Sequence, residues 1–160
     1  MTACLLLVVD DSPATLAAAR YALHLARALG ARVRAVSIVA DGVLTDAVTS
    51  VSAHPDVGAR RDLAAHSVLA HVERLAGLEE VEIETGLLFG DIAERVLDES
   101  RRVHPDLIVL ARGGAPRPGG RALAPWAGRL LEFAEQPVLV VPGERAVSSR
   151  GQIEGWVVEA

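Results

Sequence analysis

Two acidic residues and a glycine-rich loop are the parts of this sequence that could do chemistry. Asp10 and Asp11 directly follow an apolar run, where carboxylates can coordinate a metal ion or accept hydrogen bonds from ribose hydroxyls. The second feature, residues 112–121, reads Arg-Gly-Gly-Ala-Pro-Arg-Pro-Gly-Gly-Arg and is too rich in Gly and Pro for a helix or strand. A loop between a buried strand and a helix is where open α/β sheets bind ligands. These two features are therefore the candidate site.

Other chemistries find little support among the residues. No Gly-x-Ser-x-Gly turn of a serine hydrolase occurs, and His66 and His71 are five residues apart, one more than in a helical zinc pair. The chain has no lysine, which excludes lysine nucleophiles and the P-loop lysine. Paired acids also occur at the start of response-regulator receiver domains, but those need an Asp after the third strand and a Lys after the fifth. This chain has no lysine, and Asp56 follows no apolar strand, so a receiver domain is excluded. For Asp11, capping of the next helix is the favoured interpretation. We expect no catalytic residues and no metal site.

Five apolar runs alternate with helical patterns and would position these residues. The predicted strands cover residues 4–9, 33–39, 81–85, 106–111 and 137–141. The predicted helices cover 13–29, 60–76, 90 to just before Pro105, and 123–134. Ser12 is expected to cap the first helix, whose inward face would be Ala18, Ala22, Leu25 and Leu29. Gly30 and Gly77 are expected to end the first and second helices.

This alternation predicts an α/β fold with a five-stranded parallel doubly wound sheet of the Rossmann type, in strand order 3-2-1-4-5. The third strand is placed at an edge because its apolar residues alternate with glutamates. Residues 1–142 would form one domain, with an irregular connection at 41–58. Residues 143–160 form a tail that could add a strand, contact a partner subunit or remain loose.

Charge and composition exclude several classes of partner. The net charge of −5 disfavours nucleic acid and anionic membrane surfaces, both of which attract basic faces. No apolar run approaches the roughly 20 residues of a membrane span, and no basic signal-peptide start precedes the first strand. The single cysteine, Cys4, is expected to be a core residue. We expect a cytoplasmic protein.

Several segments, taken in order, resemble the universal stress protein family. They are Val9-Asp10-x-Ser12, Gly90-Asp91, the run 106–109 followed by the glycine loop, and Pro137-Val-Leu-Val-Val141. The resemblance covers about residues 3–142. It implies an adenine-nucleotide α-hydrolase-like fold, a cytoplasmic homodimer and a role in the stress response. Many members of this family bind ATP and others do not.

The resemblance also implies positions for a nucleotide. In ATP-binding members the loop reads Gly-x2-Gly-x9-Gly-Ser/Thr, and these places fall on Ala111, Gly114, Ala124 and Pro125, of which only Gly114 matches. A Cβ crowds a backbone that must approach phosphate, and a proline supplies neither a hydroxyl nor an N–H. By the same resemblance, Asp10 corresponds to the acid near the ribose, Val8 to a neighbouring backbone position and Ile38 to the residue beside the adenine.

Arginines in or near the loop, at 112, 117, 121 and 129, could clamp phosphate in place of the glycines. The favoured interpretation is that they keep the loop soluble. We therefore expect a regulatory or interaction module with unidentified protein clients and weak or no ATP binding. The alternative is an ATP- or AMP-binding sensor, with slow ATPase activity, that uses arginines such as Arg112. A homodimer is expected to form through the last strand, at Val138, Leu139, Val140 and Val141.

Overall fold

The computed structural model describes residues 2–10, 12–40, 56–113 and 123–143, which form five strands and four helices. In chain order these are β1 (Cys4–Val9), α1 (Pro13–Leu29), β2 (Arg32–Val39), α3 (Asp56–Leu78), β3 (Ile83–Phe89), α4 (Ile92–Val103), β4 (Leu107–Ala111), α5 (Pro125–Phe133) and β5 (Val138–Val141). None of the helices in this part of the chain has the length and apolarity needed to cross a membrane.

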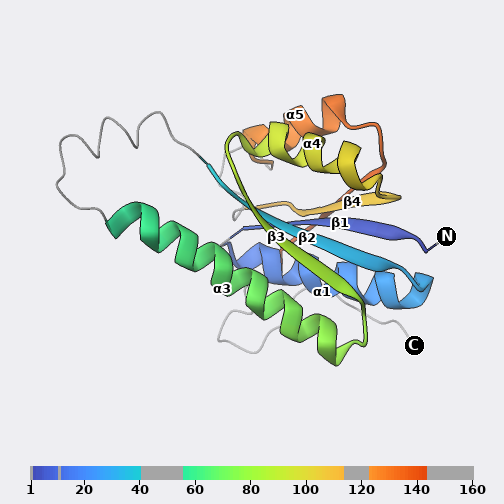
Figure 1. Cartoon of the computed structure of the whole chain (residues 1–160). Coiled ribbons are helices and arrows are strands. Elements are labelled where there is room, and N and C mark those ends of the chain that lie inside the picture. The colour runs from blue at the N-terminus through green and yellow to red at the C-terminus, as the bar shows by residue number, and fades with distance from the viewer. Residues whose placement is uncertain (1, 11, 41–55, 114–122, 144–160) are drawn as a thin grey trace, which may run out of the picture.

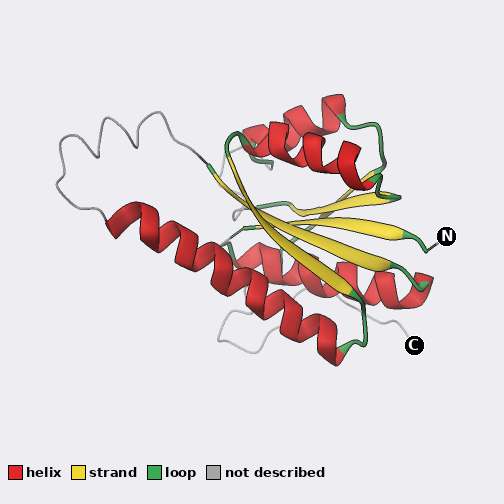
Figure 2. Ribbon diagram, in the orientation of Figure 1, coloured by secondary structure: helices red, strands yellow, loops and turns green. Residues whose placement is uncertain are grey.

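The strands form one parallel sheet in the order β3-β2-β1-β4-β5. Helices α1 and α3 cover one face of this sheet, and α4 and α5 cover the other (Figure 1). Figure 2 shows the resulting three layers, with the sheet in yellow between two layers of red helices. The predicted fold class and strand order are confirmed.

The core lies on both faces of β1, the central strand, whose six residues are all buried. Side chains alternate along a strand, so Leu5, Leu7 and Val9 pack beneath α1 and α3, while Leu6 and Val8 pack beneath α4 and α5. A strand covered on both faces needs an uninterrupted apolar sequence. This requirement explains why β1 was readily predicted.

Helix α1 has the predicted bounds, and Gly30 ends it in the left-handed conformation, with a φ of 62° and its N–H bonded to the last carbonyls. Two details of the prediction are wrong. Leu29, expected to face inward, is 58% exposed because it is the last helical residue. Ser12 occupies the capping position but makes no side-chain cap bond, since its hydroxyl donates to Asp10 instead.

The second helix and the third strand differ most from the prediction. Helix α3 begins at Asp56, inside the predicted connection, and continues past Gly77. It ends where Glu80 takes a φ of 56° and the Val81 amide bonds to the Ala76 carbonyl at 3.0 Å. Val81 therefore belongs to the helix end, and β3 begins two residues later and runs on to Phe89.

The remaining differences are of one or two residues. Asp91 is the N-cap of α4, so that helix begins at Ile92. Helix α5 begins at Pro125 and ends at Phe133, inside the predicted range. The tail at 143–160 lies almost entirely outside the described residues.

Candidate functional site

Asp10 leaves the carboxyl end of β1 and is held by bonds within its own turn. Its Oδ1 accepts from the Ser12 amide at 2.9 Å, from the Ser12 hydroxyl, and from the Thr15 hydroxyl at 2.6 Å. The Asp10 amide in turn donates to Thr15 Oγ1 at 2.9 Å. Thr15 is only 1% exposed, so the pair fixes the carboxylate at the edge of the sheet.

Thr15 is a residue that the sequence prediction missed. A threonine in the first turn of a helix that follows Asp-x-Ser was the available signal, since such hydroxyls bond to nearby backbone and side-chain groups. Within the described part of the chain, these three bonds to the carboxylate all end on Oδ1, so a ligand would approach Asp10 through Oδ2. Asp11 lies outside the described residues.

Val8 and Ile38, the positions implied beside the nucleotide, lie on the face covered by α4 and α5. The Val8 side chain is buried in that core cluster, and Ile38 packs against it half-buried near the carboxyl end of β2. Asp10, in contrast, lines a hollow between α1 and α3. The structure therefore brings the three residues to one edge of the sheet but turns Asp10 towards the other face.

The loop after β4 begins as an extension of the sheet. Ala111 is buried and pairs with Val141, and the Arg112 amide donates to the Val141 carbonyl at 2.8 Å. Gly113 then takes a φ of 70°, a conformation that a side chain would strain. Arg112 is exposed. Three predicted loop residues lie outside the described part of the chain, namely Gly114, Arg117 and Arg121.

The beginning of α5 has few donors for a phosphate. Ala124 is the N-cap and makes no side-chain bond, and Pro125 occupies the first turn without an N–H. The Ala127 amide is bonded to the Ala124 carbonyl at 3.0 Å. Of the first three helical residues, Trp126 alone remains to offer an amide to an anion. A helix start that binds phosphate normally presents several.

Arg129 is engaged in an ion pair with the start of α4. Its Nη1 lies 3.0 Å from Asp91 Oδ2, while Asp91 Oδ1 accepts from the Glu94 amide at 3.0 Å. Bonding to that amide, with Arg129 alongside, lowers the pKa of Asp91. The arginine expected as one phosphate clamp therefore joins α5 to α4 instead.

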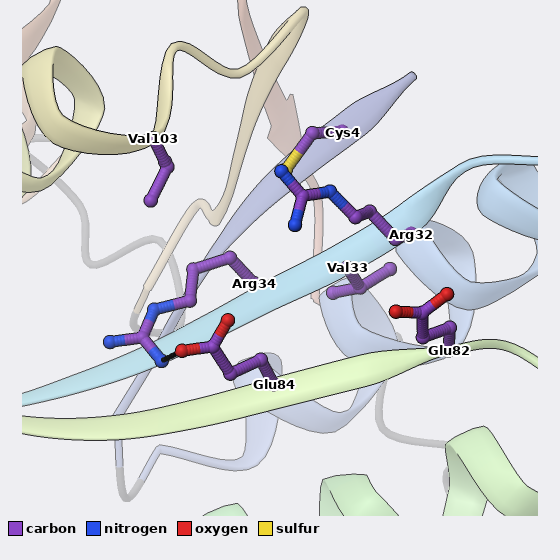
Figure 3. A pocket seen from close by; sticks show the side chains of 7 residues that line it. All are labelled: Cys4, Arg32, Val33, Arg34, Glu82, Glu84 and Val103. Carbon is purple, nitrogen blue, oxygen red and sulfur yellow. Dashed lines mark hydrogen bonds and ion pairs between the residues drawn. The ribbon is translucent and has the colours of Figure 1, made fainter. Parts of the chain in front are cut away.

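A second polar group, at the amino edge of the sheet, was also missed. Here Cys4, Arg32, Arg34 and Glu84 line a cavity of about 30 Å³, which has room for about one water molecule (Figure 3). Burial raises the pKa of the Cys4 thiol, and this cysteine lies in the core as expected. The cavity is too small for a cofactor.

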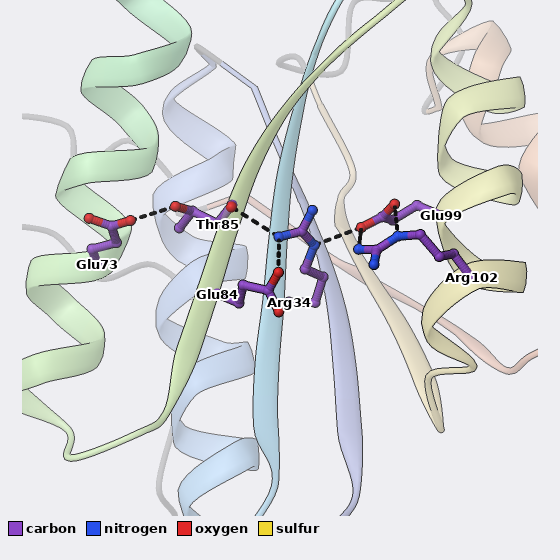
Figure 4. Close-up of polar contacts among 6 residues, drawn as sticks. All are labelled: Arg34, Glu73, Glu84, Thr85, Glu99 and Arg102. Carbon is purple, nitrogen blue, oxygen red and sulfur yellow. Dashed lines mark hydrogen bonds and ion pairs between the residues drawn. The ribbon is translucent and has the colours of Figure 1, made fainter.

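Arg34 connects two strands and a helix in the amino-edge cluster, which we define as Arg34, Glu84, Glu99 and Arg102 (Figure 4). Its Nε lies 2.6 Å from Glu99 Oε1, its Nη1 lies 2.9 Å from Glu84 Oε1, and the same Nη1 donates to the Thr85 carbonyl at 2.9 Å. The side chains of Arg34 and Glu99 are 11% and 7% exposed. An arginine inside an apolar strand was the signal for this cluster.

Glu99 accepts from both arginines of the cluster. Arg102 Nη2 lies 2.6 Å and Arg102 Nε 3.0 Å from its carboxylate oxygens. Bonding to Arg102, and then to Arg34, lowers the pKa of Glu99 although burial opposes this. Among the residues whose side chains are described, no three His, Cys, Asp or Glu gather as metal ligands would.

Comparisons with known proteins support the fold and identify the family. The model of the Universal stress protein family matches residues 1–142. UspA from Lactobacillus plantarum has a TM-score of 0.73 at 21% identity, over 87% of this chain and 97% of that chain. No protein with a curated description matches the chain.

Two further solved structures are nucleotide complexes of universal stress proteins. One, in complex with cAMP, has a TM-score of 0.64 at 18% identity, over 88% of this chain and 97% of that chain. The other, from Archaeoglobus fulgidus and in complex with dAMP, has a TM-score of 0.62 at 18% identity, over 88% and 97% of the two chains. The resemblance seen in the sequence is confirmed, and the chain belongs to the universal stress protein family.

Proposed function

We propose that this protein is a non-catalytic regulatory or interaction module of the cytoplasmic stress response that binds ATP weakly or not at all. The observation that carries this proposal is the beginning of α5. There Ala124 makes no side-chain bond, Pro125 lacks an N–H, and the Ala127 amide is used internally. A triphosphate would have to be held by backbone N–H groups and a hydroxyl that these residues do not supply.

Calorimetric titration with ATP tests this proposal. The wild-type protein is expected to show no saturable binding, because the phosphates lack donors. The double variant Ala124→Gly/Pro125→Ser returns a flexible cap, an N–H and a hydroxyl, and is expected to gain affinity for ATP. Tight binding by the wild type that Asp10→Ala abolishes would refute the proposal.

A nucleotide sensor is the second candidate, and it is favoured by the ligands of two similar proteins. Their structures contain cAMP and dAMP, each with a single phosphate. A monophosphate needs fewer donors than ATP, and Arg112 is exposed next to the loop. Saturable binding of AMP without binding of ATP would support this candidate. Hydrolysis of ATP that Arg112→Ala slows would support the ATPase form of it.

We further propose a homodimer through β5, an edge strand of the described sheet. Val138, Leu139 and Val140 are each half-buried, and β5 borders an apolar hollow of about 470 Å³ shared with α1. Tyr21 of α1 lines this hollow and is 51% exposed. Covering such an apolar surface favours association.

Sedimentation at micromolar concentration tests the dimer. Tyr21→Arg is expected to shift the wild-type dimer towards monomer, because it places a charge in the proposed interface. Leu78→Arg is the matched control, since Leu78 is 81% exposed at the end of α3. A wild-type protein that sediments as a monomer would refute this arrangement.

A further inference from the structure

The apolar hollow between α1 and β5, of about 470 Å³, lies beside the point where the chain leaves the sheet. Ala17 and Tyr21 line it from α1, and Leu139, Val141 and Pro142 line it from β5 and the residue after it. Tyr21 is 51% exposed, although its ring is a large apolar group. An exposed aromatic side chain beside an apolar hollow marks a surface that binds another apolar group.

The chain leaves β5 on the side of this hollow. Gly143 lies against the first turn of α1, so closely that a Cβ placed on it would be 3.2 Å from the Cβ of Ala14. Ala14, Ala17 and Tyr21 follow one another at spacings of three and four residues, so they share one face of α1. The chain beyond Gly143 therefore starts at one end of the helix face that lines the hollow.

The residues beyond Gly143 contain a bulky apolar segment, Trp156-Val157-Val158. Trp156 lies 13 positions after Gly143, a length of chain that can span up to about 40 Å when extended. Helix α1, with 17 residues, is about 25 Å long. The indole of Trp156 can therefore reach every part of the hollow.

The charges beside the hollow and beside the apolar segment are complementary. Arg20 and His24, both exposed, are the polar side chains that line the hollow. Glu154 and Glu159 flank the apolar segment on its two sides. Opposite charges at the rim of an apolar contact favour one partner and one orientation more than they add affinity.

We propose that Trp156 and the two valines after it bind in this hollow of their own chain. A tethered segment acts at an effective concentration on the order of millimolar, which exceeds the micromolar concentration of a partner subunit. The tail therefore covers the hollow in the single chain, and a partner subunit that uses Tyr21 has to displace it. Because the tail can bind whether or not two chains associate, this contact goes beyond the proposed homodimer.

Fluorescence of the full chain tests the contact. Trp126 is the other tryptophan, so the emission of Trp156 is obtained as the difference between each protein and its Trp156→Phe version. This emission is expected at short wavelength and shielded from acrylamide. Tyr21→Arg should increase the fraction of unbound tail about tenfold, as expected for loss of a central aromatic contact. Leu29→Arg, at another exposed residue of α1, is the matched control and should leave the emission unchanged.

Dilution from micromolar to nanomolar concentration shows which chain supplies the indole. Shielding of Trp156 that persists on dilution supports a contact within one chain, and shielding that is lost would place the tail on a partner subunit and overturn the proposal. Water-exposed emission in the wild type, or shielding that Tyr21→Arg leaves unchanged, would also overturn it. A protein that sediments as a monomer with Trp156 shielded supports the tail contact and refutes only the homodimer.

Discussion

The carboxyl and amino edges of the sheet, where the strands end and begin, are held by different kinds of bonds. At the carboxyl edge, Asp10 bonds to Ser12 and Thr15 within its own turn, and the only longer link among the side-chain pairs described there is the exposed pair of Arg129 and Asp91. At the amino edge, the amino-edge cluster joins β2 to β3 and α4 across 50 and 65 residues of sequence. Within the described residues, the amino edge therefore fixes α4 against β2 and β3, whereas the carboxyl edge is held mainly by bonds between residues close in sequence.

The largest effect is expected from breaking the amino-edge cluster at Glu99. Glu99→Ala removes the buried partner of Arg34, which stays largely buried itself. We expect this substitution to lower the free energy of unfolding by about 3 kcal/mol. Urea denaturation measures this change. Glu84→Ala is the control: Glu84 is 67% exposed, so its loss should cost less than about 1 kcal/mol. Equal effects of the two substitutions would contradict the assignment of Arg34 and Glu99 as the buried pair.

Acid should weaken the same edge selectively. The pKa of Glu99 in the folded protein is lowered from 4.5, so its contribution is complete above that value and is lost as the pH falls through the lowered pKa. The stability difference between wild type and Glu99→Gln is therefore expected to be constant near pH 7 and to shrink below about pH 4. Urea titrations at several pH values measure it. If the stability difference between the two proteins grew on acidification, the pKa of Glu99 would be raised in the folded protein and not lowered.

At the carboxyl edge, Thr15→Val should be the most damaging single change. It keeps the shape of the side chain but removes the bond partner of both the Asp10 amide and the Asp10 carboxylate, at a cost of about 1–2 kcal/mol. Thermal unfolding measures this loss. Thr15→Ser is the control. It retains the hydroxyl, so it should be clearly more stable than Thr15→Val.

The smallest effects concern the link between α4 and α5. Asp91→Ala removes both the N-cap of α4 and the pair with Arg129, and should cost about 1 kcal/mol. Arg129→Ala removes only the exposed pair and should cost less than about 0.5 kcal/mol. Chemical denaturation of both variants checks this order. If Arg129→Ala were the more damaging, α5 would depend on that ion pair more than its exposure suggests.

How far the sequence predicts this molecule depends on whether the signal is local. Runs such as Cys4–Val9 must be apolar because both faces of the strand are covered, and Gly30 marks a left-handed helix end. The limits of β3 could not be predicted from its alternating residues, because Val81 is taken up by the end of α3 and β3 extends along β2 as far as Phe89.

The candidate site was predicted less completely than the fold. Asp10, Ala124 and Pro125 lie where strand ends and helix starts were expected, since such positions follow from chain order. The contacts of Asp10 with Thr15 depend on the rotation of one turn, and those of Arg34 with Glu99 join residues 65 apart in sequence. The sequence marks Thr15 and Arg34 as polar residues in unusual places, but it does not name the groups to which they bond. Both had to be observed in the structure.

The position of Cys4 allows local opening of the sheet to be measured through its thiol. It is the single thiol of the chain, 4% exposed, and its amide bonds to Asp106 Oδ2 at 2.8 Å in the strand at the centre of the sheet. A thiol reagent can reach the sulfur when the amino end of β1, or the side chains that cover it, move aside. The labelling rate in native buffer would then measure how often this end of the central strand opens, without any denaturant and without an engineered cysteine.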